Sequence, residues 1–297
     1  MRKYLLLILI PVIACLFFFS ACKSRYEKIR TSTDLALKYK TATYYFNKRD
    51  FTRALPLLED LSTSMKGSDK AEDAAYFYAY CEFYLKDFAI SRNLFQTFAE
   101  QFPNSLRAEE ARFMSAKCSM QESPVFSLDQ ENTTKAIDAL QLFINLYPHS
   151  TRIAECNKMM DVLRGKLESK SFENAKLYYT IGEFKPAVIA LKNSQRDFPD
   201  SKFREETEFL IIKCNYLYAG GSILAKQEER YNETLQSFES FKENFPKSVH
   251  LREAEKIVSD SKRAINNVKK TLQEYADAEL AYQKANRIVK DSTSKKK

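Results

Sequence analysis

Cysteine and histidine are the residues of this chain with the widest chemical range, because they bind metals and act as nucleophiles. The 297-residue chain has six cysteines and two histidines. His149 and His250 stand in or beside proline-containing turns, far apart in the sequence. The sequence contains no glycine-rich phosphate loop, no G-x-S-x-G and no closely spaced metal ligands. We therefore predict a binding or scaffolding protein, with no enzymatic activity, cofactor or metal.

Cys22 ends a segment with the layout of an export signal. Arg2 and Lys3 precede an apolar stretch from Tyr4 to Phe19, and the chain becomes polar directly after Cys22. This order of a charged start, an apolar middle and small residues before a cleavage point is that of a signal peptide. A membrane-spanning helix needs about 20 apolar residues, and this stretch is shorter.

The Ser-Ala-Cys ending of this segment resembles the lipobox of bacterial lipoproteins. The resemblance implies that diacylglycerol is attached to Cys22, that residues 1–21 are removed, and that the new amino terminus is acylated with a palmitate-type chain. Two or three acyl chains give stable anchoring that one chain does not. Cys15 also follows an alanine, but it is the weaker candidate because apolar residues continue after it.

The other cysteines of the exported chain show a repeat. Cys81, Cys118 and Cys214 end the similar segments AAYFYAYC, EARFMSAKC and EFLIIKC. Equivalent positions in stacked helices are separated by about 8–10 Å or more. That separation exceeds the ~7 Å limit for the Cα atoms of a disulfide. We therefore predict that these cysteines are small packing residues.

The net charge of +8 is concentrated at the ends of the chain. Residues 22–261 carry 35 basic and 35 acidic side chains, whereas residues 262–297 carry ten basic and four acidic. We therefore expect no basic face on the folded part and no nucleic-acid partner. The basic tail is typical of a solvated end, and contact with anionic lipid or an acidic partner is the alternative.

One four-residue phrase occurs four times, and it marks the boundaries of a repeat. In each copy the serine is followed five residues later by a glutamate, and then by a small residue. The proline is expected to stop one helix, and the serine hydroxyl to cap the next. The copies are Phe102-Pro103-Asn104-Ser105, Tyr147-Pro148-His149-Ser150, Phe198-Pro199-Asp200-Ser201 and Phe245-Pro246-Lys247-Ser248, with Glu110, Glu155, Glu206 and Glu253.

A second helix precedes each proline. Small or apolar residues at offsets 0, 3, 7, 10 and 14 trace one helix face, starting at Phe51, Phe88, Thr133, Phe184 and Tyr231. The residues before four of these openings include three good N-caps, Asp50, Asp87 and Asn132, and a poorer one, Glu183.

These helix pairs are similar to tetratricopeptide repeats, with extra material in several units. We predict an all-α fold, an α-solenoid of about five such pairs plus a long C-terminal helix reaching about Val289. The expected order is a signal peptide (1–21), a tether after acylated Cys22 (22–33), the repeat domain (34–265) and a helix end with a basic tail (266–297). The extra material is placed at residues 121–131, in an added helical stretch at 151–167, and at 219–230.

Tyrosines are concentrated in the first two repeats. They are either seam-filling side chains or the lining of a groove for an aromatic-ended peptide. The candidate groove residues are Tyr44, Tyr45, Tyr76, Tyr78, Tyr80 and Tyr84.

Two segments carry a family resemblance. SPVFSLDQENTTKAIDALQLFINLYPHS (123–150) and LRGKLESKSFENAKLYYTIGEFKPAVIAL (163–191) resemble the third-repeat region and the long connecting helix of the BamD family, in its Bacteroidetes-like branch. The resemblance implies a lipoprotein of the β-barrel assembly machine, anchored in the outer membrane and facing the periplasm. It implies that repeats from about Asp34 to Pro103 receive unfolded barrel clients, and that the surface from about Lys170 onward docks on a BamA-like barrel. Other lipoproteins of the machine are further implied partners.

Two alternatives belong to other classes of function. A repeat lipoprotein that scaffolds cell-wall synthesis or division would share the anchor and the repeats. A lipid-anchored hydrolase would need convergent polar side chains, which the sequence does not offer.

Overall fold

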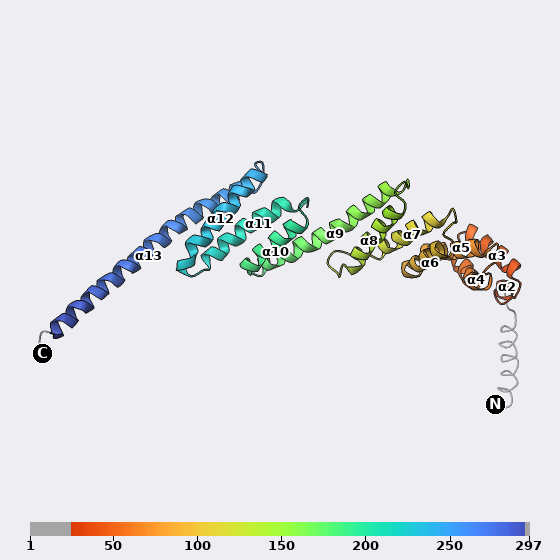
Figure 1. Ribbon diagram of the computed structural model, residues 1–297, viewed down its shortest axis with the longest axis horizontal. Helices are drawn as coiled ribbons and strands as arrows, with labels where there is room; N and C mark the ends of the chain where they lie inside the picture. Colours follow the sequence, from red (N-terminus) through yellow and green to blue (C-terminus); the bar gives the residue numbers. More distant parts are fainter. Residues whose placement is uncertain (1–24, 295–297) are drawn as a thin grey trace, which may run out of the picture. The chain divides into compact units, whose positions relative to one another are not determined.

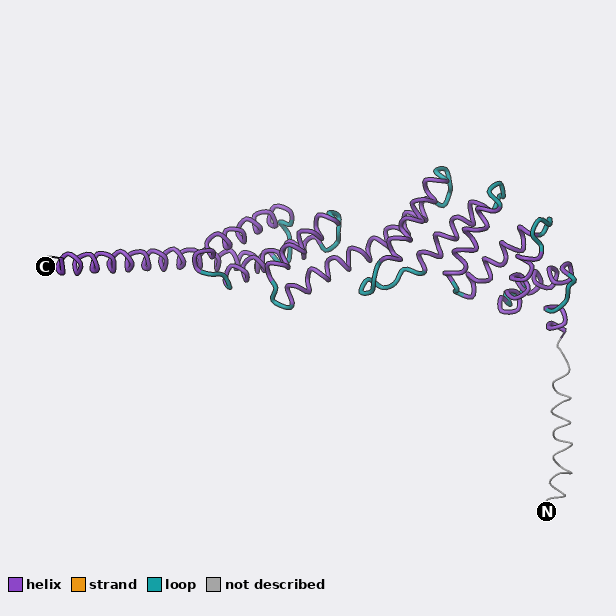
Figure 2. Tube along the Cα trace, turned by 60° about the horizontal axis from the view of Figure 1, so that its bottom comes forward, coloured by secondary structure: helices purple, strands orange, loops and turns teal. Residues whose placement is uncertain are grey.

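The computed structural model describes residues 25–294 of the backbone, and the side chains as far as residue 285. Helices connected by turns and short loops make up this part of the chain, and it contains no strand (Figures 1 and 2). The helices are α2 (Arg25–Arg30), α3 (Leu35–Asn47), α4 (Phe51–Ser64), α5 (Ala71–Leu85), α6 (Phe88–Gln101), α7 (Ala108–Gln121), α8 (Glu131–Leu146), α9 (Ile153–Thr180), α10 (Phe184–Asp197), α11 (Arg204–Gly220), α12 (Leu224–Asn244) and α13 (Leu251–Ser294).

Five helix pairs follow the short α2, and α13 comes after them. The pairs are α3 with α4, α5 with α6, α7 with α8, α9 with α10 and α11 with α12. Helices neighbouring in sequence pack against one another through most of the chain. The all-α solenoid of tetratricopeptide-like pairs predicted from the sequence is therefore confirmed.

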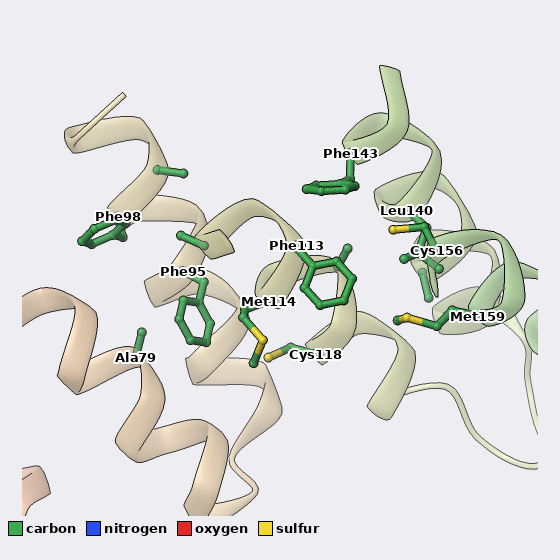
Figure 3. Close-up of a cluster of buried hydrophobic side chains, with 14 of the residues drawn as sticks. Ala79, Phe95, Phe98, Phe113, Met114, Cys118, Leu140, Phe143, Cys156 and Met159 are labelled. Carbon is green, nitrogen blue, oxygen red and sulfur yellow. The ribbon is translucent and has the colours of Figure 1, made fainter. Parts of the chain in front are cut away.

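The chain divides into two compact units, at Leu163 and Arg164. In the first unit, one apolar cluster lies within the first two pairs and a larger one joins α5 to the start of α9, including Phe95, Phe143 and Cys156 (Figure 3). In the second unit, apolar clusters join α9 to α11 and α11 to α13. Each core is therefore a sum of contacts between neighbouring repeats, as in other stacked-repeat folds.

Aspartates start two of the second helices, as predicted. The Asp50 and Asp87 carboxylates accept the backbone N–H groups of Arg53 and Ile90, each at 3.2 Å. The prediction that Asn132 caps α8 is wrong. That helix begins at Glu131, and Asp129 accepts the Glu131 N–H at 2.9 Å. The loop before α8, residues 122–130, supplies its own cap, so the helix starts before the position that the repeat predicts.

The serine of each repeated turn does not cap the next helix as predicted, because α7 and α11 follow Arg107 and Phe203 and have no side-chain cap. The serine closes the turn ahead of the helix instead. The hydroxyl oxygens of Ser105, Ser150, Ser201 and Ser248 each accept the backbone N–H two residues on, at 3.0–3.2 Å. Three of these hydroxyls also donate, at 2.6 Å, to a glutamate near the start of an earlier helix. These bonds join Ser105 to Glu72, Ser150 to Glu109 and Ser248 to Glu205. The serine therefore ties two consecutive pairs together.

The residue two positions after each of these serines places a planar side-chain group on an aromatic ring of the preceding helix pair. The guanidinium groups of Arg107 and Arg152 each lie 4.6 Å from a ring centroid, over Tyr76 and Phe113 respectively. In the second unit, aromatic rings occupy the positions of these guanidinium groups. Phe203 stacks on Phe172 at a centroid distance of 4.5 Å, and His250 stacks on Phe209 at 4.4 Å.

The repeated glutamate adds a further contact between consecutive helix pairs. It accepts a hydrogen bond from one equivalent position of the preceding pair, at 2.6–3.1 Å. The donors and acceptors are Tyr80 to Glu110, Lys117 to Glu155, Lys176 to Glu206 and Lys213 to Glu253. The regular spacing of glutamate in the sequence therefore reflects an interaction between repeats.

Ser150→Ala tests the contribution of the serine to the contact between consecutive helix pairs. We expect it to lower the free energy of unfolding by about 1 kcal/mol, because it removes the turn hydrogen bond from the Arg152 N–H and the donor to Glu109. Urea denaturation followed by circular dichroism measures the change. Ser127→Ala, at an exposed loop position, is the control and should be nearly neutral. Equal destabilisation by the two variants would contradict the role of Ser150.

The stretch at 151–167 is helical from Ile153 onward, as predicted, and it forms the first half of a continuous 28-residue helix, α9. The long last helix, α13, ends at Ser294 rather than near Val289. The predicted insertion near residues 121–131 is a loop, closed by hydrogen bonds from the Gln130 amide to the carbonyls of Val125 and Leu128, at 2.8 and 3.0 Å.

The four cysteines of the repeats are buried and unpaired. Burial raises the pKa of Cys81 and Cys214 to about 12, and that of Cys118 to about 11. A thiol with so high a pKa stays protonated near neutral pH and reacts slowly. These positions are packing positions, as the repeat phase predicted.

Candidate functional site

The six candidate tyrosines lie on α3 and α5 in the first unit. They do not form one surface, because their neighbours fall into three groups. Tyr76, Tyr80 and Tyr84 form a row along α5, Tyr78 packs against a different core cluster, and Tyr44 and Tyr45 lie near the end of α3.

The row on α5 is produced by the four-residue spacing of a helix face. The Tyr80 ring centroid lies 4.9 Å from that of Tyr76 and 5.8 Å from that of Tyr84. Tyr76 and Tyr80 are partly buried against the large cluster of the first unit, whereas Tyr84 is 49% exposed. The row therefore runs from the core to the surface.

Tyr80 has a structural partner at its hydroxyl, which donates to Glu110 Oε1 at 2.6 Å. Burial, and then this hydrogen bond, raise the pKa of Tyr80 far above its usual range. Burial also raises the pKa of Tyr76 to about 12. Both phenols therefore stay neutral at physiological pH. The two rings pack against the core, and their exposed parts can also contribute to a surface.

Tyr84 extends the row to the preceding pair of helices, α3 and α4. Its ring stacks on Phe51 at 4.5 Å with an interplanar angle of 17°, and Phe51 in turn contacts Phe46 at 5.7 Å. A stacked, half-exposed ring of this kind is rigid and offers apolar area to a partner at little entropic cost.

The other tyrosines are placed differently. Burial, and then the nearby charges of Glu59, Glu82 and Asp87, raise the pKa of Tyr78 to about 12. Tyr45 packs partly into the first cluster, and the Arg53 guanidinium lies 5.6 Å from its ring centroid. Tyr44 is 57% exposed, with its ring centroid 5.5 Å from that of Tyr45.

The second unit contains a polar cleft that sequence reasoning missed. It has a volume of about 480 Å³ and lies among α10, α11 and α12. A neighbouring cleft of about 300 Å³ shares Asn215 and Glu233 with it. Volumes of 300 to 1,000 Å³ are those of sites that hold small ligands or the side chains of a partner.

The centre of the cleft is a buried carboxylate. Glu208 is 7% exposed and accepts from the Gln195 amide at 2.8 Å and from the Asn244 amide at 3.1 and 3.2 Å. Arg204 adds a charged contact at 3.4 Å. Glu208 lies two residues after the repeated Glu206. In the sequence, the only sign that the two glutamates have different roles is that residues two apart lie on different faces of a helix.

Exposed aliphatic side chains surround the end of α9. Leu177, Ile181 and Ile189 are 57%, 61% and 54% exposed. Ile189 lines the cleft of about 300 Å³, and a third cleft, which contains Phe184 and Pro186, begins directly after Ile181. Exposed apolar side chains beside such clefts can add apolar area to a contact surface for another protein.

Cys22 and the rest of the signal segment lie outside the described residues. Among the residues that the structure describes, no helix is long and apolar enough to cross a membrane. No group of metal-binding side chains is found in the same part of the chain.

Comparisons with known proteins bear on the family. A solved structure of the yeast histone chaperone Hif1, described as a scaffold protein recruiting protein complexes to core histones, aligns with 83% of this chain and 98% of its own, at 11% identity. Its TM-score of 0.26 is too low to support an inference. No curated protein matches significantly.

A protein-family model is more informative. The model of YfiO, an outer membrane lipoprotein family, matches residues 32–229, which is well over half of the chain. The match covers both segments in which the sequence resembles BamD. The chain therefore belongs to the YfiO family of BamD-type outer membrane lipoproteins.

Proposed function

We propose that this protein is the lipid-anchored periplasmic scaffold of the outer-membrane β-barrel assembly machine. Its first unit receives unfolded barrel clients, and its second unit docks on a BamA-like barrel and on other lipoproteins of the machine. Cys22 carries the lipid anchor. The family match and the repeat fold support this role.

The observation that carries client binding is the aromatic row on α5. It ends in a rigid, half-exposed ring at Tyr84, stacked on Phe51. Barrel clients present strands with aromatic side chains, which such a surface accommodates by ring contacts. We assign the accessible contact to Tyr84, with Tyr80 and Tyr76 supporting it from the core side.

Tyr84→Ala tests this contact. We expect the affinity for a labelled peptide from the C-terminal strand of a barrel protein to fall about tenfold, as at an aromatic interface hot spot. Fluorescence anisotropy measures binding, and thermal denaturation should show only a small loss of stability. Tyr282→Ala, at a site 64% exposed on α13, is the matched control and should bind normally. Equal affinity of the two variants would contradict the proposed contact.

Tyr80→Ala should behave differently. It removes a ring packed against Phe95 at 4.9 Å and the hydrogen bond to Glu110, so its main effect should be on stability. Comparing the two tyrosines therefore separates the core role from the binding role within one row.

The exposed Leu177, Ile181 and Ile189 and the polar clefts of the second unit support docking there. They provide both apolar area and convergent hydrogen-bonding groups, the two components of protein interfaces. Affinity purification of the detergent-solubilised protein tests the role as a whole. Recovery of a BamA-like barrel is the expected result, and recovery of cell-wall enzymes without it would favour the alternative scaffold.

A further inference from the structure

The segment directly after the proposed anchor is folded onto the first helix pair. The expected tether, 22–33, contains α2, which begins at Arg25. The Tyr26 hydroxyl donates to the Arg53 carbonyl at 2.9 Å, and the Tyr26 ring centroid lies 5.7 Å from that of Tyr45. The chain is therefore fixed to α3 and α4 by residue 26 (Figure 1).

Little chain separates this contact from the membrane. This step rests on the proposed function, in which Cys22 carries the acyl chains. Three residues lead from Cys22 to Arg25, and a fully extended chain spans about 3.5 Å per residue, or roughly 11 Å in all. That distance is close to the Debye length of about 8–10 Å at physiological ionic strength. Charges on α2 are therefore within electrostatic reach of lipid headgroups.

The charge of this end of the repeat domain is strongly positive. Residues 22–53 contain nine basic and three acidic side chains. The expectation that the folded part has no basic face is therefore wrong at this end. The equal numbers of basic and acidic side chains over residues 22–261 concealed an excess of basic side chains in residues 22–53. The acidic side chains are already engaged, since Glu27 pairs with Arg30, Asp50 pairs with Arg53 and Asp34 caps α3.

Of the exposed cations that remain there without an ion pair, four lie on α2 or directly after α3. Arg25 and Lys28 on α2, and Lys48 and Arg49 directly after α3, are exposed. None of the four forms an ion pair within the part of the chain that the structure describes. Tyr44 lies one turn before Lys48 and is 57% exposed. Tyrosine, with an apolar ring and a polar tip, is enriched at the level of lipid headgroups.

We propose that α2 and the turn between α3 and α4 form a membrane-contact surface that binds anionic phospholipid headgroups. Arg25, Lys28, Lys48 and Arg49 contact the lipid phosphates, and Tyr44 enters the headgroup layer. Lipid is the favoured occupant because of the short span to the anchor and the complementary charge. The consequence is that the first repeat pair is held on the membrane instead of hanging from a flexible tether.

A single fluorophore tests this surface, because the chain contains no tryptophan. The full-length acylated protein with Tyr44→Trp is reconstituted into phosphatidylcholine vesicles with or without phosphatidylglycerol, using lipids brominated on the acyl chains. Tyr282→Trp, at a position 64% exposed on α13, is the matched reporter. Flotation of the vesicles measures anchoring, and quenching of fluorescence by bromine measures proximity to the membrane.

We expect at least about twofold stronger quenching of Tyr44→Trp than of Tyr282→Trp in anionic vesicles, with a marked decrease at high salt, which screens headgroup attraction. Adding Arg25→Gln, Lys28→Gln, Lys48→Gln and Arg49→Gln should remove this excess. Circular dichroism should remain unchanged, because all four side chains are exposed.

Four results would overturn the proposal. Floated protein with equal quenching of the two reporters would exclude the surface while leaving the anchor intact. Equal quenching of Tyr44→Trp in neutral and anionic vesicles would exclude recognition of anionic headgroups. Protection of the fluorophore by a barrel-strand peptide, without quenching by lipid, would assign the surface to clients. Protein that fails to float would contradict the anchor at Cys22 as well.

Discussion

Cys22→Ser is expected to abolish the lipid anchor and to leave the chain unprocessed. The serine hydroxyl cannot form the thioether to diacylglycerol, so neither the first acyl chain nor the later cleavage and acylation would follow. Separation of the inner and outer membranes measures the loss of the protein from the outer membrane, and mass spectrometry detects the retained residues 1–21 and the missing acyl groups. The stable anchor depends on two or three acyl chains, because even one remaining chain would hold a protein only marginally.

Cys15→Ser is the matched control, since Cys15 also follows an alanine. Apolar residues continue after Cys15, whereas the chain becomes polar after Cys22. We therefore expect Cys15→Ser to leave anchoring and acylation unchanged. Loss of acylation in Cys15→Ser, with normal acylation of Cys22→Ser, would place the acylated residue seven positions earlier. It would also lengthen the span to α2 and weaken the proposed membrane contact.

Phe143→Ala is expected to give the largest loss of stability. Its ring is 1% exposed and lies in the large cluster of the first unit, with centroids 5.6 Å from Phe113 and 5.3 Å from Tyr147. Truncating a buried phenylalanine costs about 3–5 kcal/mol, because transfer energy is lost and a cavity remains. Urea denaturation followed by circular dichroism measures the change. Since repeat stability is a sum of local and neighbour terms, the unfolding of residues 25–163 should be affected most.

Leu142→Ala is the control for this variant. Leu142 is the preceding residue on the same helix, α8, and is 53% exposed. Its truncation should change the free energy of unfolding by about 0.5 kcal/mol or less. A similar loss in both variants would show that the Phe143 cluster does not determine the stability of the first unit.

The helix pairs could be predicted from the sequence because their signals are local. A proline ends the helix before it, and an aspartate caps the helix that follows it, whatever the rest of the chain does. Asp50 and Asp87 follow the same logic. Asn132 does not, because the loop before α8 places Asp129 two residues ahead of Glu131 and so moves the helix start. A single sequence does not show which of two nearby candidates, Asp129 or Asn132, caps the helix.

The candidate site was less predictable, because the repeat phase of a tyrosine does not fix its exposure. Tyr76, Tyr80 and Tyr84 share one face of α5, yet only Tyr84 reaches the surface. The difference arises from α6 and α7, which cover the first two rings with Phe98, Phe95 and Glu110. The buried Glu208 network similarly joins α10, α11 and α12.

The sequence by itself determined the all-α repeat class, the positions of the repeated turns, the packing role of the cysteines and the resemblance to a lipoprotein family. These follow from periodicity, capping and spacing, which act within one or two helices. Only the tertiary structure decided why glutamate recurs, which aromatic rings are accessible, and that basic side chains gather around α2 and the end of α3. Those properties depend on which side chains of one repeat meet the next, and a pair of residues 30 positions apart, such as Tyr80 and Glu110, becomes a contact only when the helices stack.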